Sequence, residues 1–160
     1  MKKKGFTLAE ILVSLGIIGV VAAIVLPTFI SSHKQQVHEA TRKSAESVLE
    51  NTLSAMMAAE YAEDLSFTKI WAENQNVTNM KNTLGEYTKA SFVTSDIADG
   101  VGMMLKSGAV ISIKTTPSSL TKAADVRIDT NGSSEPNKRD VDQFHYELKY
   151  NGSLKYVKGN

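Results

Sequence analysis

The sequence has 160 residues, which suffices for one domain with a core of ordinary size and leaves little room for a second. Its 18 basic and 17 acidic residues nearly cancel, so the overall charge gives no indication of a nucleic-acid partner. Cysteine is absent, which excludes disulfide bonds, thiol catalysis and thiolate metal sites. The three histidines, His33, His38 and His145, are scattered, so a histidine-based site is not expected.

The amino-terminal segment joins a basic start to a long apolar run. Three consecutive lysines, residues 2–4, precede Gly5, and residues 11–32 contain no charged side chain. A run of that length crosses the hydrocarbon core of a bilayer as a helix. Lysines on the amino-terminal side of a span stay in the cytoplasm, so we expect the rest of the chain to lie outside it.

Three kinds of membrane signal compete for this segment. A secretory signal peptide ends in a small-residue cleavage site, and the sequence from Ala22 onward offers no convincing one. A plain signal anchor accounts for the lysines and the apolar run. It does not account for Gly5 directly before Phe6. Nor does it account for Glu10, because a carboxylate at the edge of a membrane span is costly and usually has a partner.

Residues 4–10, Lys-Gly-Phe-Thr-Leu-Ala-Glu, resemble the third kind, which is the class III signal of type IV pilins and type II secretion pseudopilins. In that family a membrane peptidase cuts between the glycine and the phenylalanine and then methylates the new amino terminus. The resemblance implies that residues 1–5 are a cleaved leader, that cleavage falls between Gly5 and Phe6, and that Phe6 becomes N-methylated. Glycine suits this position if a side chain would obstruct a narrow protease subsite.

The same resemblance gives Glu10 a role in assembly. In the family's filaments, the glutamate at this position meets the positive amino terminus of a neighbouring subunit. An unpaired carboxylate buried among apolar helices costs several kcal/mol, so a subunit in register is favoured over one out of register. The alternative is that Glu10 only reaches the membrane interface. We expect Glu10→Ala to spare membrane insertion and processing but to impair filament assembly.

The apolar run predicts the first half of a long helix, and an amphipathic pattern predicts the second half. Residues 6–32 are expected to form the transmembrane and filament-core helix. Pro27 lacks a backbone N–H and is expected to kink or loosen it, as a recurrent proline does in pilins. Residues 33–60 then show an apolar stripe at spacings of three and four. The stripe contains Ala45, Val48, Leu49, Leu53, Met56 and Met57.

The remaining residues, 61–160, are expected to form a globular head. Phe67, Ile70 and Trp71 suggest a short helix or an apolar cover for a sheet, and residues 74–82 resemble a loop. Asn151-Gly152 predicts a type I′ turn. Strand patterns occupy residues 101–106, 109–115, 125–129, 143–150 and 153–158. The expected fold class is therefore α+β, with one long helix packed on a small antiparallel sheet of four or five strands, as in pilins.

The segment from Asp129 to Asp142 is rich in side-chain oxygens and resembles a loop of many minor pilins and pseudopilins. That loop has the form Asp-x-Asn-Gly, Pro-Asn, Gly-x-Asp-x-Phe, and Asp140 stands where the family often has glycine. Such oxygens suit Ca²⁺, although the spacing of Gly132 does not fit an EF-hand. The candidate ligands are Asp129, Asn131, Asn137, Asp140 and Asp142. The favoured alternative is an Asx-rich turn whose side chains cap its own backbone. No other cofactor is expected.

The leading functional hypothesis is a structural subunit, a minor pilin or pseudopilin rather than a major pilin, in a type IV pilus or type II secretion-like filament. Its implied partners are the prepilin peptidase and methyltransferase, other pilin subunits, an inner-membrane assembly platform and the lipid bilayer. The implied location is the cytoplasmic membrane of a prokaryote, with a single pass and the head outside. Afterwards the subunit moves into a pilus or a periplasmic or surface filament.

Two other classes of function compete with that of a filament subunit. An anchored enzyme is not supported, because the sequence shows no nucleophile motif, no histidine cluster and no phosphate-binding loop. A membrane-anchored adhesin or binding domain that never polymerises is the alternative, and Glu10 argues against it if a solitary anchor has no need of that carboxylate. Competence pili bind DNA, but the lysines and tyrosines of residues 149–158 resemble a solvated edge strand more than a nucleic-acid site.

Overall fold

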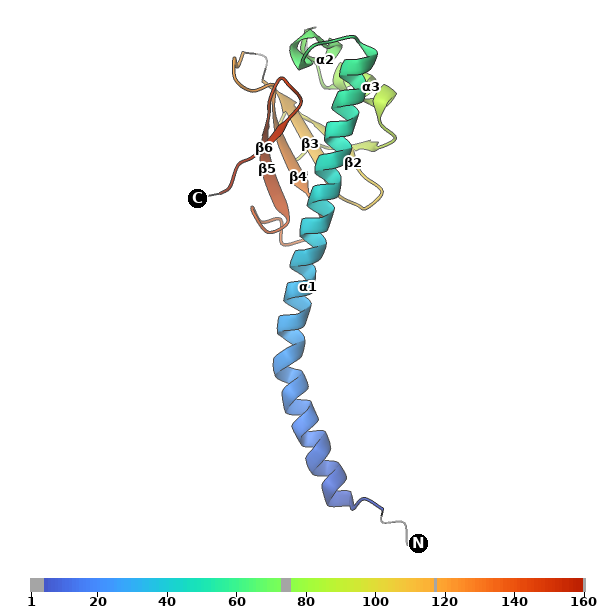
Figure 1. Ribbon diagram of the computed structural model, residues 1–160, viewed down its shortest axis with the longest axis vertical. Helices are drawn as coiled ribbons and strands as arrows, with labels where there is room; N and C mark the ends of the chain where they lie inside the picture. Colours follow the sequence, from blue (N-terminus) through green and yellow to red (C-terminus); the bar gives the residue numbers. More distant parts are fainter. Residues whose placement is uncertain (1–4, 73–75, 117, 160) are drawn as a thin grey trace. The chain divides into compact units, whose positions relative to one another are not determined.

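The computed structural model describes residues 5–72, 76–116 and 118–159 (Figure 1). The chain separates into two compact units, with the boundary between Val37 and His38. The helical elements are α1 (Leu8–Ala59), the 3₁₀ turn η1 (Leu65–Phe67), α2 (Lys69–Ala72) and α3 (Val77–Tyr87). The strands are β1 (Ser91–Val93), β2 (Val101–Met104), β3 (Val110–Thr115), β4 (Ala124–Asp129), β5 (Gln143–Leu148) and β6 (Leu154–Tyr156).

The first unit contains only the amino-terminal part of α1 and the residues before it. Its best 18-residue window has a mean hydropathy of 2.6, and none of that window is buried within the chain. The helix is therefore long and apolar enough to cross a membrane. Its hydroxyl groups bond to the helix backbone, with Ser14 Oγ donating to Glu10 O at 2.7 Å and Thr28 Oγ1 to Val25 O at 2.9 Å. Such internal bonds lower the cost of placing hydroxyls in lipid.

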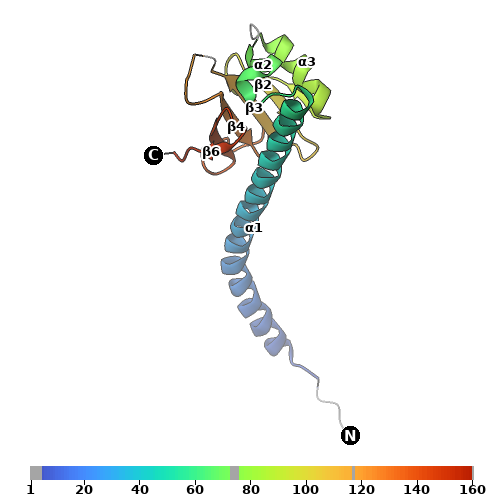
Figure 2. The ribbon, with the colours of Figure 1, turned by 45° about the horizontal axis from the view of Figure 1, so that its top comes forward.

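The second unit is a six-stranded antiparallel sheet with the carboxyl-terminal half of α1 packed on one face (Figure 2). The strand order, β1-β2-β3-β4-β5-β6, follows the sequence, so every strand pairs with its neighbour in the chain. Fully buried side chains of α1 meet the inner face of the sheet. On the helix these are Ala45, Leu49, Leu53 and Met56, and on the sheet they include Met103, Ile111, Ile113, Ile128 and Leu148. The expected α+β architecture is confirmed.

The strand register decides which side chains face α1. Burial alternates along β4 and β5, as expected for a sheet with one covered face. Val126 pairs with Tyr146 and lies on the covered face, whereas Arg127 pairs with His145 on the opposite, outer face. The outer face of these two central strands is therefore polar.

Two elements between α1 and β2 differ from the sequence prediction. Residues 74–82 were expected to be a loop, but α3 begins at Val77; residues 74 and 75 lie outside the described part. The side chain of Asn76 caps α3 by accepting from Asn79 N at 2.8 Å, and Met80 and Leu84, four residues apart, are buried. The three-residue strand β1 makes a sixth strand where four or five were expected.

The turn between β5 and β6 also differs, and the predicted type I′ geometry is wrong. Gly152 has a φ of +82°, but Asn151 is not in the left-handed region that a type I′ turn requires. Gly152 N donates to Lys149 O at 3.0 Å, and Lys149 N donates to Ser153 O at 2.9 Å. These bonds define a type I turn followed by a left-handed glycine. The β2–β3 turn has the same construction, with Gly108 at +87°.

Candidate functional site

The amino terminus of α1 is closed by its own side chains. Thr7 is the last residue before the helix, and Ile11 N donates to Thr7 O at 3.2 Å. Glu10 Oε2 accepts two hydrogen bonds from Thr7, from its backbone N at 2.8 Å and from its Oγ1 at 2.9 Å. In return, Glu10 N approaches Thr7 Oγ1 at 3.2 Å. This reciprocal pattern is a capping box, which satisfies backbone donors that a helix start leaves free.

The capping box changes the argument about Glu10. The sequence analysis assumed that a solitary membrane anchor does not need this carboxylate. In the structure, however, the carboxylate caps the helix of its own chain. The sequence pattern of this cap was visible, because a threonine followed three residues later by glutamate, before an apolar run, is typical of a capping box. Glu10 alone therefore does not distinguish a filament subunit from a plain anchor.

The predicted cleavage position, between Gly5 and Phe6, lies before the helix in non-helical backbone. Phe6 is 85% exposed. A Cβ atom built on Gly5 would meet no atom of this chain within 4 Å, and its φ is not in the left-handed region. Nothing in the described fold therefore requires glycine here, and the cleavage position stays a prediction.

Pro27 lies inside α1, and the helix continues through it. Its missing N–H removes one backbone hydrogen bond, because proline cannot donate to the carbonyl four residues earlier. Two hydroxyls beside it, of Thr28 and Ser31, donate to helix carbonyls at 2.9 and 3.0 Å. A kink at Pro27 stays a prediction.

Asp142 organises the loop that the sequence analysis proposed as a Ca²⁺ site, residues 129–142, called the Asp-Asn loop below. Its side chain is fully buried. One carboxylate oxygen accepts from Asn137 N at 2.8 Å and the other from Lys138 N at 2.6 Å. Both oxygens are thus used to hold the loop's own backbone, as in an Asx-rich turn.

Asp129, which ends β4, is buried and serves the same loop. Its Oδ1 accepts from Asn131 N at 3.1 Å, and its Oδ2 accepts from Gln143 Nε2 at 3.0 Å. Burial raises the pKa of Asp129, and the hydrogen bonds from Gln143 and Asn131 oppose that rise. Asn137 also contributes when its side-chain amide is oriented with the nitrogen toward the neighbouring acceptors. That nitrogen then donates to Asp129 Oδ2 at 3.2 Å and to Gly132 O at 3.3 Å.

Asp140 is directed elsewhere, toward the carboxyl terminus of the chain. Its Oδ1 accepts from Tyr156 OH at 2.5 Å and its Oδ2 from Gly159 N at 2.7 Å. The hydrogen bond from Tyr156 lowers the pKa of Asp140. Its φ of +61° is in the left-handed region, which explains why the related loops often carry glycine there.

The structure brings the five candidate Ca²⁺ ligands together only in part, and Ca²⁺ binding by this loop stays a prediction. Asp140 is separated from the others by its bonds to Tyr156 and Gly159, and both oxygens of Asp142 bind backbone N–H groups. Within the described residues, no group of three or more acidic or histidine side chains is arranged to hold a metal ion. Asn131 Oδ1 is buried without a hydrogen-bond partner in the described chain, and it alone does not make a Ca²⁺ site.

Two contacts that the sequence analysis missed tie α1 to the sheet and to the Asp-Asn loop. His38 Nδ1 lies 2.7 Å from Thr130 Oγ1, which itself donates to Asp142 O at 3.0 Å, so His38 is the donor to Thr130. The Arg42 guanidinium lies over the rings of Phe144 and Tyr156, 5.1 and 5.2 Å from their centroids. No short-range pattern in the sequence could have revealed these pairs, because the partners are far apart in the chain.

Comparison with known proteins adds one finding at the amino terminus. A family model described as the prokaryotic N-terminal methylation motif matches residues 1–26. The match includes Gly5, Phe6 and Glu10 and most of the uncharged stretch. No curated protein matches the chain.

Proposed function

We propose that the chain is a minor pilin or pseudopilin of a type IV pilus or type II secretion-like filament. The prepilin-type methylation motif and the pilin-like α+β fold support membership of the type IV pilin and pseudopilin family. Proteins of this family are structural subunits rather than enzymes. The motif implies processing by a prepilin peptidase. Proposed further partners are other pilin subunits, an assembly platform in the inner membrane and the lipid bilayer.

One observation carries the proposal most directly: the large apolar side chains of α1 in the first unit are exposed in the described part of the chain. Exposed fractions of large apolar residues from Leu8 to Ile30 run from 45% to 78%. An apolar surface this extensive on a chain of this size requires an outside partner. Lipid supplies that cover before assembly, and the corresponding helices of neighbouring subunits supply it in a filament.

The proposed topology places the leader in the cytoplasm and the head outside it. Lysines 2–4 supply the positive flank that sets this orientation. The cleavage position, next to the lysines, then faces the cytoplasmic side of the membrane. The proposed location is the cytoplasmic membrane of a prokaryote, followed by transfer into a pilus or a periplasmic or surface filament.

Mass spectrometry of the amino-terminal peptide tests the proposal, on protein from cells that carry the matching peptidase. The expected product begins with N-methylated Phe6. Gly5→Leu is expected to block cleavage, because its side chain occupies the space that the peptidase needs, while Ser14→Ala serves as a control that is processed normally. A wild-type chain that keeps its Met1 terminus would instead identify a plain membrane anchor.

The capping box favours a second candidate, a membrane-anchored binding or adhesin domain that never polymerises. In such a protein Glu10 needs no neighbour, because Thr7 already supplies its hydrogen bonds. Methylation and processing distinguish the two candidates only in part. Recovery of the processed chain in sheared or purified filaments decides for the subunit, and its retention in the membrane alone decides for the anchored domain.

A further inference from the structure

The outer face of β4 and β5 carries an acidic pair and a basic pair, each made of two residues directly opposite each other on the two strands. The register pairs Asp125 with Glu147 and, two residues along, Arg127 with His145. All four side chains are partly exposed on the face opposite α1. Like charges in directly opposed positions destabilise a strand pair, so the two carboxylates need counter-charges.

The acidic pair finds its counter-charges within the chain. Lys122 Nζ lies 2.7 Å from Asp125 Oδ1, and Lys155 Nζ lies 3.7 Å from Glu147 Oε2. Each carboxylate of this pair therefore has its own lysine.

The basic pair has no such partner. Arg127 donates from NH1 to Asp96 O at 2.9 Å, and nearby Arg139 donates from NH2 to Val157 O at 2.9 Å. Neither guanidinium forms an ion pair with any residue that the structure describes. The buried Nε–H of Arg127 also has no hydrogen-bond partner among those residues. The neighbouring carboxylate, Asp140, is held by Tyr156 and Gly159.

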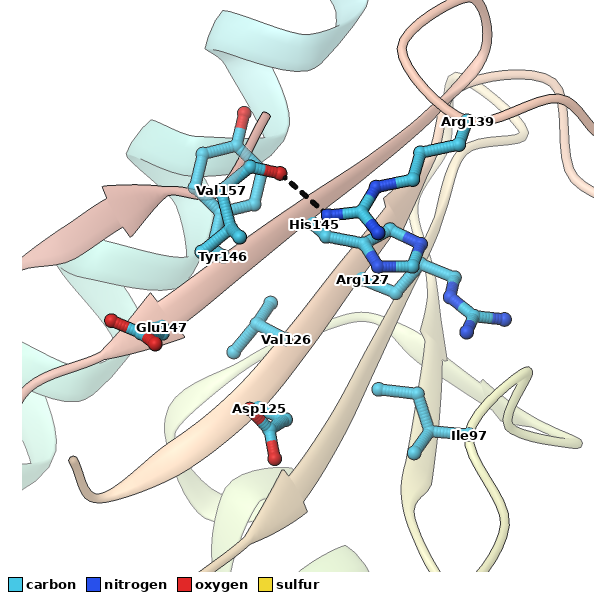
Figure 3. A pocket seen from close by; sticks show the side chains of 9 residues that line it. All are labelled: Ile97, Asp125, Val126, Arg127, Arg139, His145, Tyr146, Glu147 and Val157. Carbon is cyan, nitrogen blue, oxygen red and sulfur yellow. Dashed lines mark hydrogen bonds between the residues drawn. The ribbon is translucent and has the colours of Figure 1, made fainter. Parts of the chain in front are cut away.

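Arg127, Arg139 and His145 line a pocket of about 300 Å³ (Figure 3). Its floor is the outer face of β4 and β5, and its walls are Ile97 on one side and Arg139 with Val157 on the other. Figure 3 shows the side chain of His145 lying between those of Arg127 and Arg139. Arg127, Arg139 and His145 therefore lie side by side in a concave site, which Asp125 and Glu147 also line.

The electrostatic state of His145 reflects its burial first and the two nearby arginines second. Burial lowers the pKa of His145, and the positive charges of Arg127 and Arg139 lower it further. Asp140 and Asp125 act in the opposite direction and do not cancel these effects. A bound anion would supply the charge that the chain lacks at this point.

We propose that this pocket binds a small free oxyanion, through a carboxylate or phosphate group held by Arg127, Arg139 and His145. Guanidinium groups present several N–H donors in a fork that matches both kinds of anion, and such charge-assisted hydrogen bonds are strong. The site is independent of the amino-terminal helix and of the filament proposal.

Nuclear magnetic resonance of the full chain in neutral detergent micelles tests the proposal, with inorganic phosphate and malonate as the two probes. The chain has three arginines, so the Nε–H resonances of Arg127, Arg139 and Arg42 are separable. We expect saturable shifts of Arg127 and Arg139 at low ionic strength, where charge interactions are least screened. Arg42 packs against Phe144 on the opposite face and is expected to stay unchanged.

Variants with matched charge loss complete the experiment. Arg127→Gln and Arg139→Gln are each expected to weaken binding about tenfold or more, because each removes a charge-assisted contact. Lys114→Gln removes one positive charge from the outer face of β3, outside the pocket, and is expected to change the affinity less than about twofold. Absence of a saturable shift with both probes, or an equal loss in all three variants, would overturn the proposal.

Discussion

At Glu10, one carboxylate serves the start of its own helix and is also the proposed partner of a neighbouring amino terminus. Within the chain it accepts two hydrogen bonds from Thr7, and replacement by alanine removes both. An alanine variant therefore combines a weakened helix start with the loss of a charge. Glutamine separates the two effects, because it completes a capping box as glutamate does but carries no charge.

We predict that Glu10→Gln impairs filament assembly as strongly as Glu10→Ala, because the proposed contact requires a negative charge. Thr7→Ala keeps the charge and removes the cap, which costs about 1 kcal/mol, and is expected to assemble. Assembly is measured as the processed chain recovered in filaments, with membrane insertion and processing followed in parallel. Normal assembly of Glu10→Gln together with failure of Glu10→Ala would assign Glu10 to the cap alone.

At the level of elements, the stability of the head depends on the face of α1 that packs on the sheet. Leu53 lies in the middle of that face and is fully buried. We predict that Leu53→Ala lowers the free energy of unfolding by about 2–5 kcal/mol, since it removes buried methyl groups and leaves a cavity. Leu120→Ala, at a position that is 96% exposed, is the control and should change it by less than about 0.5 kcal/mol. Denaturant unfolding followed by Trp71 fluorescence measures both, and equal losses would contradict the packing described here.

The Asp-Asn loop gives a second prediction at this scale, which separates the Asx-rich turn from a Ca²⁺ site. Asp142→Ala leaves the N–H groups of Asn137 and Lys138 without an acceptor and is expected to cost about 2–4 kcal/mol. Asp142→Asn keeps one acceptor oxygen and should cost less. Both losses should be the same in Ca²⁺ and in a chelator, as measured by thermal unfolding. A wild-type midpoint that rises by several degrees on addition of Ca²⁺ alone would replace the turn with a metal site.

For the molecule as a whole, local patterns predicted much of the fold, and contacts distant in sequence remained hidden. Five of the six strands and a helix ending near residue 60 followed from the alternation and the spacing of apolar residues. The strand β1 has only three residues, and α3 has only two buried residues, Met80 and Leu84, with a cap that rests on the single residue Asn76. Asp140 was grouped with Asp142 because the two are close in sequence, whereas the fold turns it toward Tyr156.

The candidate sites differ in the same respect: one is local in the sequence, and the other is assembled from distant segments. Gly5, Phe6 and Glu10 lie in one continuous motif, so the sequence alone could identify them. The outer-face pocket is assembled from β4, β5, the loop before β2 and the segment after β6. Its key property, an arginine directly opposite a histidine with a second arginine beside them, depends on a strand register that the sequence does not state.

The strand order has a consequence for how the head forms. Every strand pairs with the one before it in the chain, so no strand has to wait for a distant partner. With the proposed topology, the head crosses the membrane from its amino-terminal side, and the buried face of α1 emerges before any strand does. Each hairpin can then close on that face in the order in which it is delivered, which suits a protein that folds while it is being exported.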